Sequence, residues 1–201
     1  LCDRRQRQMC IRDSNNYLKK LRKAIADNSS DPILNDSPIH AAMVMGVILD
    51  HSKEVSMYCG RFAIFRDDFK KIIDDCIKEK VNVGEAKFDP LQDLRESLKT
   101  FLEKGGYFEV VLEKNEPDLK NEPIWDILKA YLGKQVKIRL ANPDAIYKDA
   151  YHFFVGDKKM YRRESDPTER TAICCFNNVE KANVLLERFD QLVTGSRILY
   201  S

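Results

Sequence analysis

The sequence predicts an α/β fold, in which a mixed, mainly parallel sheet is flanked by helices and preceded by two N-terminal helices. Between residues 90 and 142, a helical pattern followed by glycine and an apolar strand occurs twice, which is typical of parallel βαβ connections. After Pro143, short apolar runs alternate with charged turns, which indicates a hairpin and a further strand. A last amphipathic pattern, from Asn177 to Gly195, predicts a covering helix.

The first fourteen residues are expected to stand outside this fold. Residues 4–14 read RRQRQMCIRDS, and each of them fits the conceptual translation of a transposase-based sequencing adaptor. Other interpretations of such a basic run are a disordered tail and an arm that binds nucleic acid. We interpret residues 1–14 as an adaptor-derived artefact of an assembled environmental (metagenomic) sequence, so that the native N-terminus lay upstream of Asn15.

The charge balance does not favour a nucleic-acid partner. The chain has 34 Lys and Arg and 32 Asp and Glu, and residues 1–14 supply four Arg and two Asp. The remainder therefore has 30 residues of each sign and no positive excess to attract a polyanion. No apolar run approaches the ~20 residues of a membrane span, and no secretory signal occurs, so we expect a cytoplasmic protein without a membrane partner.

The cysteines and motifs indicate neither a metal nor a cofactor. Beyond residue 14 the cysteines are Cys59, Cys76, Cys174 and Cys175, which form no CxxC pair. We therefore predict reduced, buried thiols. Phosphate-binding glycine loops and the zincin, serine-hydrolase and EF-hand motifs do not occur in the sequence.

The N-terminal segment, residues 15–53, is expected to form two helices. Leu18, Leu21 and Ile25 recur at helical spacing between basic residues, which predicts an amphipathic helix. After a loop, Ser37 and Pro38 predict the N-cap and first turn of the apolar helix IHAAMVMGVILDH. Because this helix is apolar on most sides, we expect it to be buried, with a dimerisation element in a purely structural interaction domain as the alternative.

The α/β domain is expected to span residues 54–201. Its predicted strands are EVSMYCGRF, YFEVVLE, QVKIRLAN, YHFFVGD, MYRRES and TAICCFN. Its predicted helices cover residues 67–80, residues 90–104, the short run IWDILKAYLG and the C-terminal run after Asn177.

Residues 151–178 carry a resemblance to a known family. The run YHFFVGDKKMYR followed by AICCFNN resembles the second half of a phospholipase-D-like domain, where one strand carries HxKx4D and the next ends in a turn with an Asn. The order of the preceding elements is also similar, so the resemblance covers residues 54–193. It implies a His nucleophile, a Lys and an Asn that hold phosphate, and two motifs that meet in one site, often across a dimer.

The motif is incomplete in this chain. Asp157 matches the motif's Asp, and Asn177 or the Asn after it matches its Asn, but His152 precedes Asp157 by five residues instead of seven. In one register Phe154 replaces the Lys, and in the other Ala150 replaces the His. Attack on a phosphodiester requires both a nucleophile and a cation on the phosphate oxygens, so either register lacks an essential group.

The candidate catalytic residues are therefore His152, Asp157 and Asn177, and the candidate anion-binding residues are Lys158, Arg162 and Arg163. The alternative for His152 is a core histidine bonded to a backbone carbonyl, and the alternative for the arginines is a solvated turn.

The sequence thus favours a non-catalytic phospholipase-D-like binding or regulatory domain of a prokaryotic protein. We expect no cofactor or specific nucleic acid, and we predict a homodimer and an anionic or phosphate-bearing ligand. The alternative is a phosphodiesterase or nuclease of that superfamily, whose rearranged site would use His152, Asn177 and a displaced cation such as Lys158 across a dimer.

Overall fold

The computed structural model describes residues 16–66, 69–71, 89–115, 117–146, 151–166 and 171–200. The adaptor-like residues 1–14, Cys76, Ala150 and most of the helix predicted over residues 67–80 lie outside these ranges. Residues 16–26 are helical, as the periodicity of the leucines predicts.

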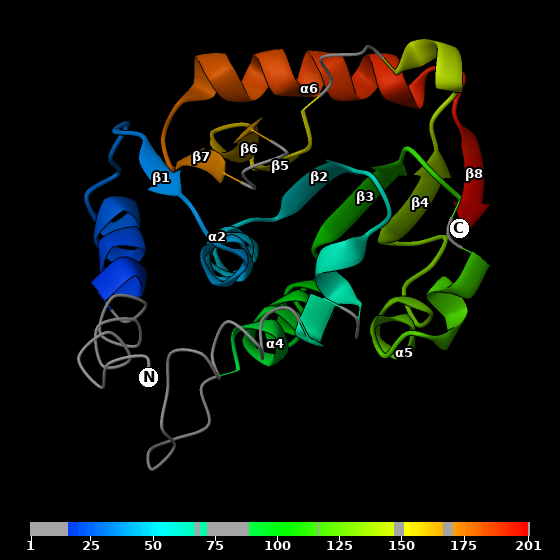
Figure 1. Ribbon diagram of the computed structural model, residues 1–201, viewed down its shortest axis with the longest axis horizontal. Coiled ribbons are helices and arrows are strands. Elements are labelled where there is room, and N and C mark those ends of the chain that lie inside the picture. The colour runs from blue at the N-terminus through cyan, green and yellow to red at the C-terminus, as the bar shows by residue number, and fades with distance from the viewer. Residues whose placement is uncertain are drawn as a thin grey trace, which may run out of the picture.

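In the described part of the chain, eight strands form one open sheet in the order β1-β7-β6-β5-β2-β3-β4-β8 (Figure 1). The strands are β1 (Ile33–Asn35), β2 (Glu54–Cys59), β3 (Tyr107–Leu112), β4 (Val136–Leu140), β5 (Phe153–Gly156), β6 (Met160–Asp166), β7 (Thr171–Cys175) and β8 (Arg197–Tyr200). The helices are α2 (Pro38–Asp50), α4 (Pro90–Glu103), α5 (Ile124–Leu128) and α6 (Val179–Val193), with 3-10 turns η1 (Ala63–Phe65), η2 (Pro117–Asn121) and η3 (Pro143–Ala145).

The predicted α/β class with a mixed sheet flanked by helices is confirmed, but the balance of strand directions differs from the prediction. β2, β3 and β4 are parallel, whereas every other pairing, from β1 with β7 to β4 with β8, is antiparallel. Helix α4 enters β3 and α5 lies between β3 and β4, whereas β5 and β6 are joined by a tight turn. The tight turn reverses the chain and makes β5 and β6 antiparallel. Because most of the strand pairings are antiparallel, the sheet is not mainly parallel.

Helices cover both faces of the sheet (Figure 1). Helices α2 and α4 pack against each other on one face, and α6 crosses the other face. Helix α2 begins at the N-cap Ser37, whose side chain accepts a hydrogen bond from the His40 amide, and ten of its residues are buried. Helix α2 is therefore part of the core in this structure, which explains why its sequence is apolar on most sides.

We call one edge of the sheet the carboxyl edge, because the parallel strands β2, β3 and β4 end there. The antiparallel strand β5 begins at this edge, and β6 ends at it. Polar residues that follow β2 and β3, precede β5 or end β6 therefore gather in one place. In open α/β sheets, the carboxyl ends of parallel strands are where ligand sites usually form.

Candidate functional site

Backbone hydrogen bonds extend the sheet at the carboxyl edge and place three ionisable side chains there. The Glu113 amide donates to the Cys59 carbonyl over 3.0 Å, just beyond the ends of β2 and β3. The Glu164 amide donates to the His152 carbonyl over 2.9 Å, at the start of β5. Glu113, His152 and Glu164 thus come from separate segments of the chain, and the strand pairing brings them together.

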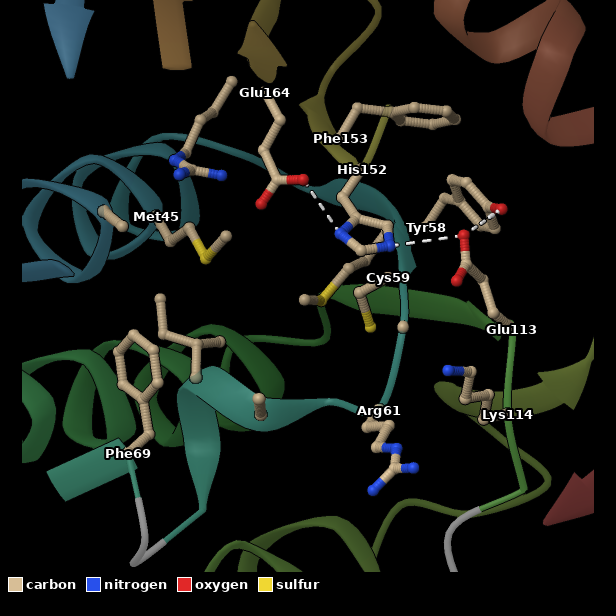
Figure 2. A pocket seen from close by; sticks show the side chains of 16 residues that line it. Met45, Tyr58, Cys59, Arg61, Phe69, Glu113, Lys114, His152, Phe153 and Glu164 are labelled. Carbon is tan, nitrogen blue, oxygen red and sulfur yellow. Dashed lines mark hydrogen bonds and ion pairs between the residues drawn. The ribbon is translucent and has the colours of Figure 1, made fainter. Parts of the chain in front are cut away.

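The His152 ring lies between two carboxylates (Figure 2). Its Nδ1 is 2.9 Å from Oε2 of Glu164, and its Nε2 is 3.3 Å from Oε1 of Glu113. The same Glu113 oxygen accepts a 2.6 Å hydrogen bond from the Tyr58 hydroxyl, whose ring meets the imidazole edge-on. Each ring nitrogen therefore lies within ion-pair distance of a carboxylate, although the contact of Nε2 with Glu113 does not have hydrogen-bond geometry. We call Glu113, His152 and Glu164 the acid-histidine cluster.

The acid-histidine cluster favours a charged imidazole. Burial alone would lower the pKa of His152, but the close contacts and negative charges of Glu113 and Glu164 outweigh it and raise the pKa to about 9. The close contact with His152 lowers the pKa of the Glu113 carboxyl. Burial, together with the hydrogen bond to Glu113, raises the pKa of Tyr58. At neutral pH, the cluster therefore consists of an imidazolium between two carboxylates.

The cluster forms the polar side of a cavity of about 400 Å³, a size typical of small-molecule sites. Its other walls are largely apolar and come from α2, β2 and the segment around η1; they include Ala41, Met45, Met57, Ala63 and Ile64. Arg61 and Lys114, exposed residues that follow β2 and β3, also line the cavity (Figure 2). Cys59 lines it as well, but burial raises the pKa of its thiol to about 12, so it is not a thiolate at neutral pH.

Arg162 is the most deeply buried cation among the cavity residues, with 6% of its surface exposed. It lies on β6, where it pairs with Phe154 of β5, and its Nε donates a hydrogen bond to Oδ1 of the fully buried Asn35. Asn35 in turn donates to the Ser37 carbonyl at the start of α2. The buried guanidinium is therefore anchored through β1, a strand that the sequence did not predict.

The structure places the other candidate residues elsewhere. Asp157 and Lys158 form the turn after β5, at the opposite end of that strand from His152, and both have positive φ. The Asp157 carboxylate accepts hydrogen bonds from the amides of Lys53 and Glu54 over 2.8 and 3.0 Å. Asp157 therefore caps a strand end within this chain, far along the sheet from His152.

Asn177 and Arg163 are also separate from the cavity. The Asn177 side chain donates a 3.1 Å hydrogen bond to the carbonyl of Asn28, beyond the end of β7. Helix α6 is capped by the next residue, Asn178, whose side chain accepts a hydrogen bond from the Lys181 amide. Arg163 is exposed, and its guanidinium lies over the ring of Tyr151. The structure thus unites neither the three catalytic candidates nor the three anion-binding candidates.

Sequence reasoning missed Glu113, Glu164 and Tyr58. A usable signal existed for Glu113, because an acidic residue directly after an apolar parallel strand lies at the carboxyl edge. Glu164 carried no such signal, since its position depends on the register of the β5-β6 hairpin. His152 is not the predicted core histidine bonded to a backbone carbonyl: its side chain is 30% exposed and contacts carboxylates.

The cluster does not have the geometry of a metal site. Glu113 and Glu164 contact opposite nitrogens of the ring, so the three side chains do not converge on one point. Within the described ranges, no group of three or more His, Cys, Asp or Glu side chains could hold a metal ion. The same ranges contain no helix that is both long and apolar enough to cross a membrane.

Solved structures with a similar fold include Nuc and TrmBL2, although no family model and no curated protein sequence matches the chain. Nuc from Salmonella typhimurium, a phospholipase D family member, aligns with a TM-score of 0.53 at 12% identity over 85% of this chain and 100% of its own. TrmBL2, an archaeal chromatin protein with a novel mode of DNA binding, aligns with a TM-score of 0.53 at 13% identity over 94% of this chain and 64% of its own. The fold of this chain is therefore phospholipase-D-like.

Proposed function

We propose that this chain is a non-catalytic phospholipase-D-like domain with a binding or regulatory role, and that its ligand occupies the cavity at the carboxyl edge. The observation that supports this proposal is the placement of His152 between Glu113 and Glu164. Both contacts keep the imidazole charged and engaged, so it is poorly suited to attack a phosphorus atom.

A histidine nucleophile must present a neutral nitrogen to the phosphate. With the pKa of His152 at about 9, only on the order of 1% of the imidazole is neutral at pH 7. Moreover, the carboxylates beside each nitrogen would repel the negative oxygens of a phosphodiester, instead of stabilising the charge that develops on them. The missing motif residue and the acid-histidine cluster therefore both favour binding without hydrolysis.

A phosphodiesterase or nuclease with a rearranged site is the second candidate. It is favoured by one observation, namely that His152 lines an open cavity instead of lying sealed in the core. Because Asn177 and Lys158 lie elsewhere in the same chain, such a site would need these groups from a second copy. Homodimerisation and cytoplasmic location remain predictions, and sedimentation velocity of the purified chain tests the first.

Hydrolysis of bis-p-nitrophenyl phosphate and of single-stranded and duplex DNA separates the two candidates. We expect the purified chain and its His152→Ala variant to show the same background rate with each substrate. As the matched control, Asp157→Asn alters the opposite end of β5 and keeps the side-chain acceptor for the Lys53 and Glu54 amides. Turnover that depends on enzyme concentration and is lost in His152→Ala but kept in Asp157→Asn would overturn the non-catalytic proposal.

A further inference from the structure

The guanidinium of Arg162 has two amino groups to which no described residue is hydrogen-bonded. Arg162 donates from Nε to Asn35, and no hydrogen bond joins either Nη atom to another residue in the described part of the chain. Neither Nη atom is among the fully buried atoms without a partner, so both retain some accessible surface. Arg162 as a whole is 6% exposed, and it lines the cavity.

A buried arginine keeps its charge and loses most of its hydration, so an unused donor pair is costly unless an anion accepts from it. Glu164 lies close enough to interact electrostatically with Arg162 but makes no ion pair with it within 4 Å, and its carboxylate instead contacts His152. The two parallel donors of a guanidinium match the two oxygens of a carboxylate. The Nη atoms of Arg162 therefore offer the pair of donors that a carboxylate accepts.

We propose that the cavity binds a small organic carboxylate with an apolar body, whose carboxylate accepts hydrogen bonds from both Nη atoms of Arg162. This inference rests on the proposed function, because it names the ligand class of the same cavity. The apolar walls around Met45, Met57 and Ile64 accommodate the hydrocarbon part of such a ligand.

The charges of the cavity favour a monoanion. Its charged side chains are four cations, including the protonated His152, and two carboxylates, which leaves a net charge of +2. The remaining cations, Arg61 and Lys114, are exposed and make no ion pair with a carboxylate of the described residues. They can attract an anion towards the cavity. A phosphate dianion would bring more negative charge close to Glu164, so we expect inorganic phosphate to bind more weakly than a carboxylate.

Methionine methyl groups report occupancy of this cavity directly. Met45 and Met57 line it, whereas Met43 and Met160 do not and serve as internal references. The full chain is labelled with [13C-methyl]methionine and titrated separately with sodium hexanoate, neutral hexanamide and inorganic phosphate, while the methyl signals are followed by NMR. We expect saturable shifts of the Met45 and Met57 signals with hexanoate, and binding weaker by roughly tenfold or more with hexanamide, which lacks the charge.

Two neighbouring arginines provide the matched pair of variants. Arg162→Met removes the guanidinium from the cavity and should weaken hexanoate binding by roughly tenfold or more, with little effect on hexanamide. Arg163→Met removes an equal charge one residue away, on the exposed side of the same strand, and should leave both affinities unchanged. Arg162→Lys, which keeps the charge but not the fork, should give an intermediate loss.

Any of four results would overturn the inference. These are hexanamide binding as tightly as hexanoate, phosphate binding more tightly than hexanoate, equal losses in Arg162→Met and Arg163→Met, and no shift of Met45 or Met57 with hexanoate, butyrate or benzoate. If circular dichroism shows that Arg162→Met does not fold, the comparison of hexanoate with hexanamide in the unmodified chain still tests whether the cavity prefers a carboxylate. The hydrolysis assay is a separate measurement, so failure of the non-catalytic proposal and failure of the ligand class can be told apart.

Discussion

The acid-histidine cluster makes a quantitative prediction about stability at alkaline pH. The pKa of His152 is about 9 in the folded protein, against about 6.5 for a histidine in an unfolded chain. Because the folded value is the higher one, the stabilisation is fully present below about pH 6.5 and is lost as pH rises through about 9. The difference corresponds to about 3 kcal/mol, which we reduce to about 2 kcal/mol because the side chain is 30% exposed.

The assay is urea unfolding of the unmodified chain and of His152→Gln at a series of pH values from about 6 to about 10. Other groups titrate in both proteins, so the difference between their free energies of unfolding isolates His152. We expect the advantage of the unmodified chain to shrink by about 2 kcal/mol over this range.

Proton NMR provides an independent measurement, because the chain has three histidines and the variant identifies the His152 signals. Glu113→Gln removes one of the two carboxylates and should lower the pKa of His152. An imidazole that titrates at or below about 6.5, or a free-energy difference that stays constant with pH, would refute the charged cluster.

Three further predictions concern residues around the site. Gly156→Ala should destabilise the chain by about 2 kcal/mol or more in urea unfolding, because its new Cβ would collide with Oγ of Ser52 and lie 2.6 Å from Cγ2 of Ile48. An unchanged unfolding midpoint would contradict this packing. Asp157→Ala should lower the free energy of unfolding by about 1–3 kcal/mol, because the amides of Lys53 and Glu54 lose their acceptor. The same variant should bind hexanoate as the unmodified chain does, and weaker binding would show that Asp157 contributes to the cavity. Phe154→Lys, which restores a motif residue type at a fully buried position, should cost about 3 kcal/mol or more and produce no hydrolysis; a stable, active variant would show that the side chain reaches the cavity.

The helices and central strands could be predicted because their local patterns are strong. The apolar stripe that ends at Gly105, and the run YFEVVLE after it, specify α4 and β3 without any information from the rest of the chain. The two strands that were missed, β1 and β8, have three and four residues and lie at the two edges of the sheet. Segments this short contain too few residues to show a period of two, and only pairing with β7 and β4 makes them strands.

The candidate site was predictable in part. The sequence identified His152 and Arg162, which both line the cavity, but grouped them with residues that lie elsewhere. Proximity in sequence did not indicate proximity in space, because a strand is an extended segment. His152 and Asp157 are five residues apart and lie at opposite ends of β5. Conversely, Glu113 is far from His152 in sequence and contacts it in space.

The sequence by itself determined the α/β class and the order of the main elements, because hydrophobic periodicity is a local property. Only the tertiary structure decided what His152 and Arg162 can do. The charge of His152 depends on Glu113 and Glu164, and the anchoring of Arg162 depends on Asn35, and each partner reaches its place through strand register. Electrostatic interactions depend on distance in space and on burial, and neither quantity exists until the sheet has formed.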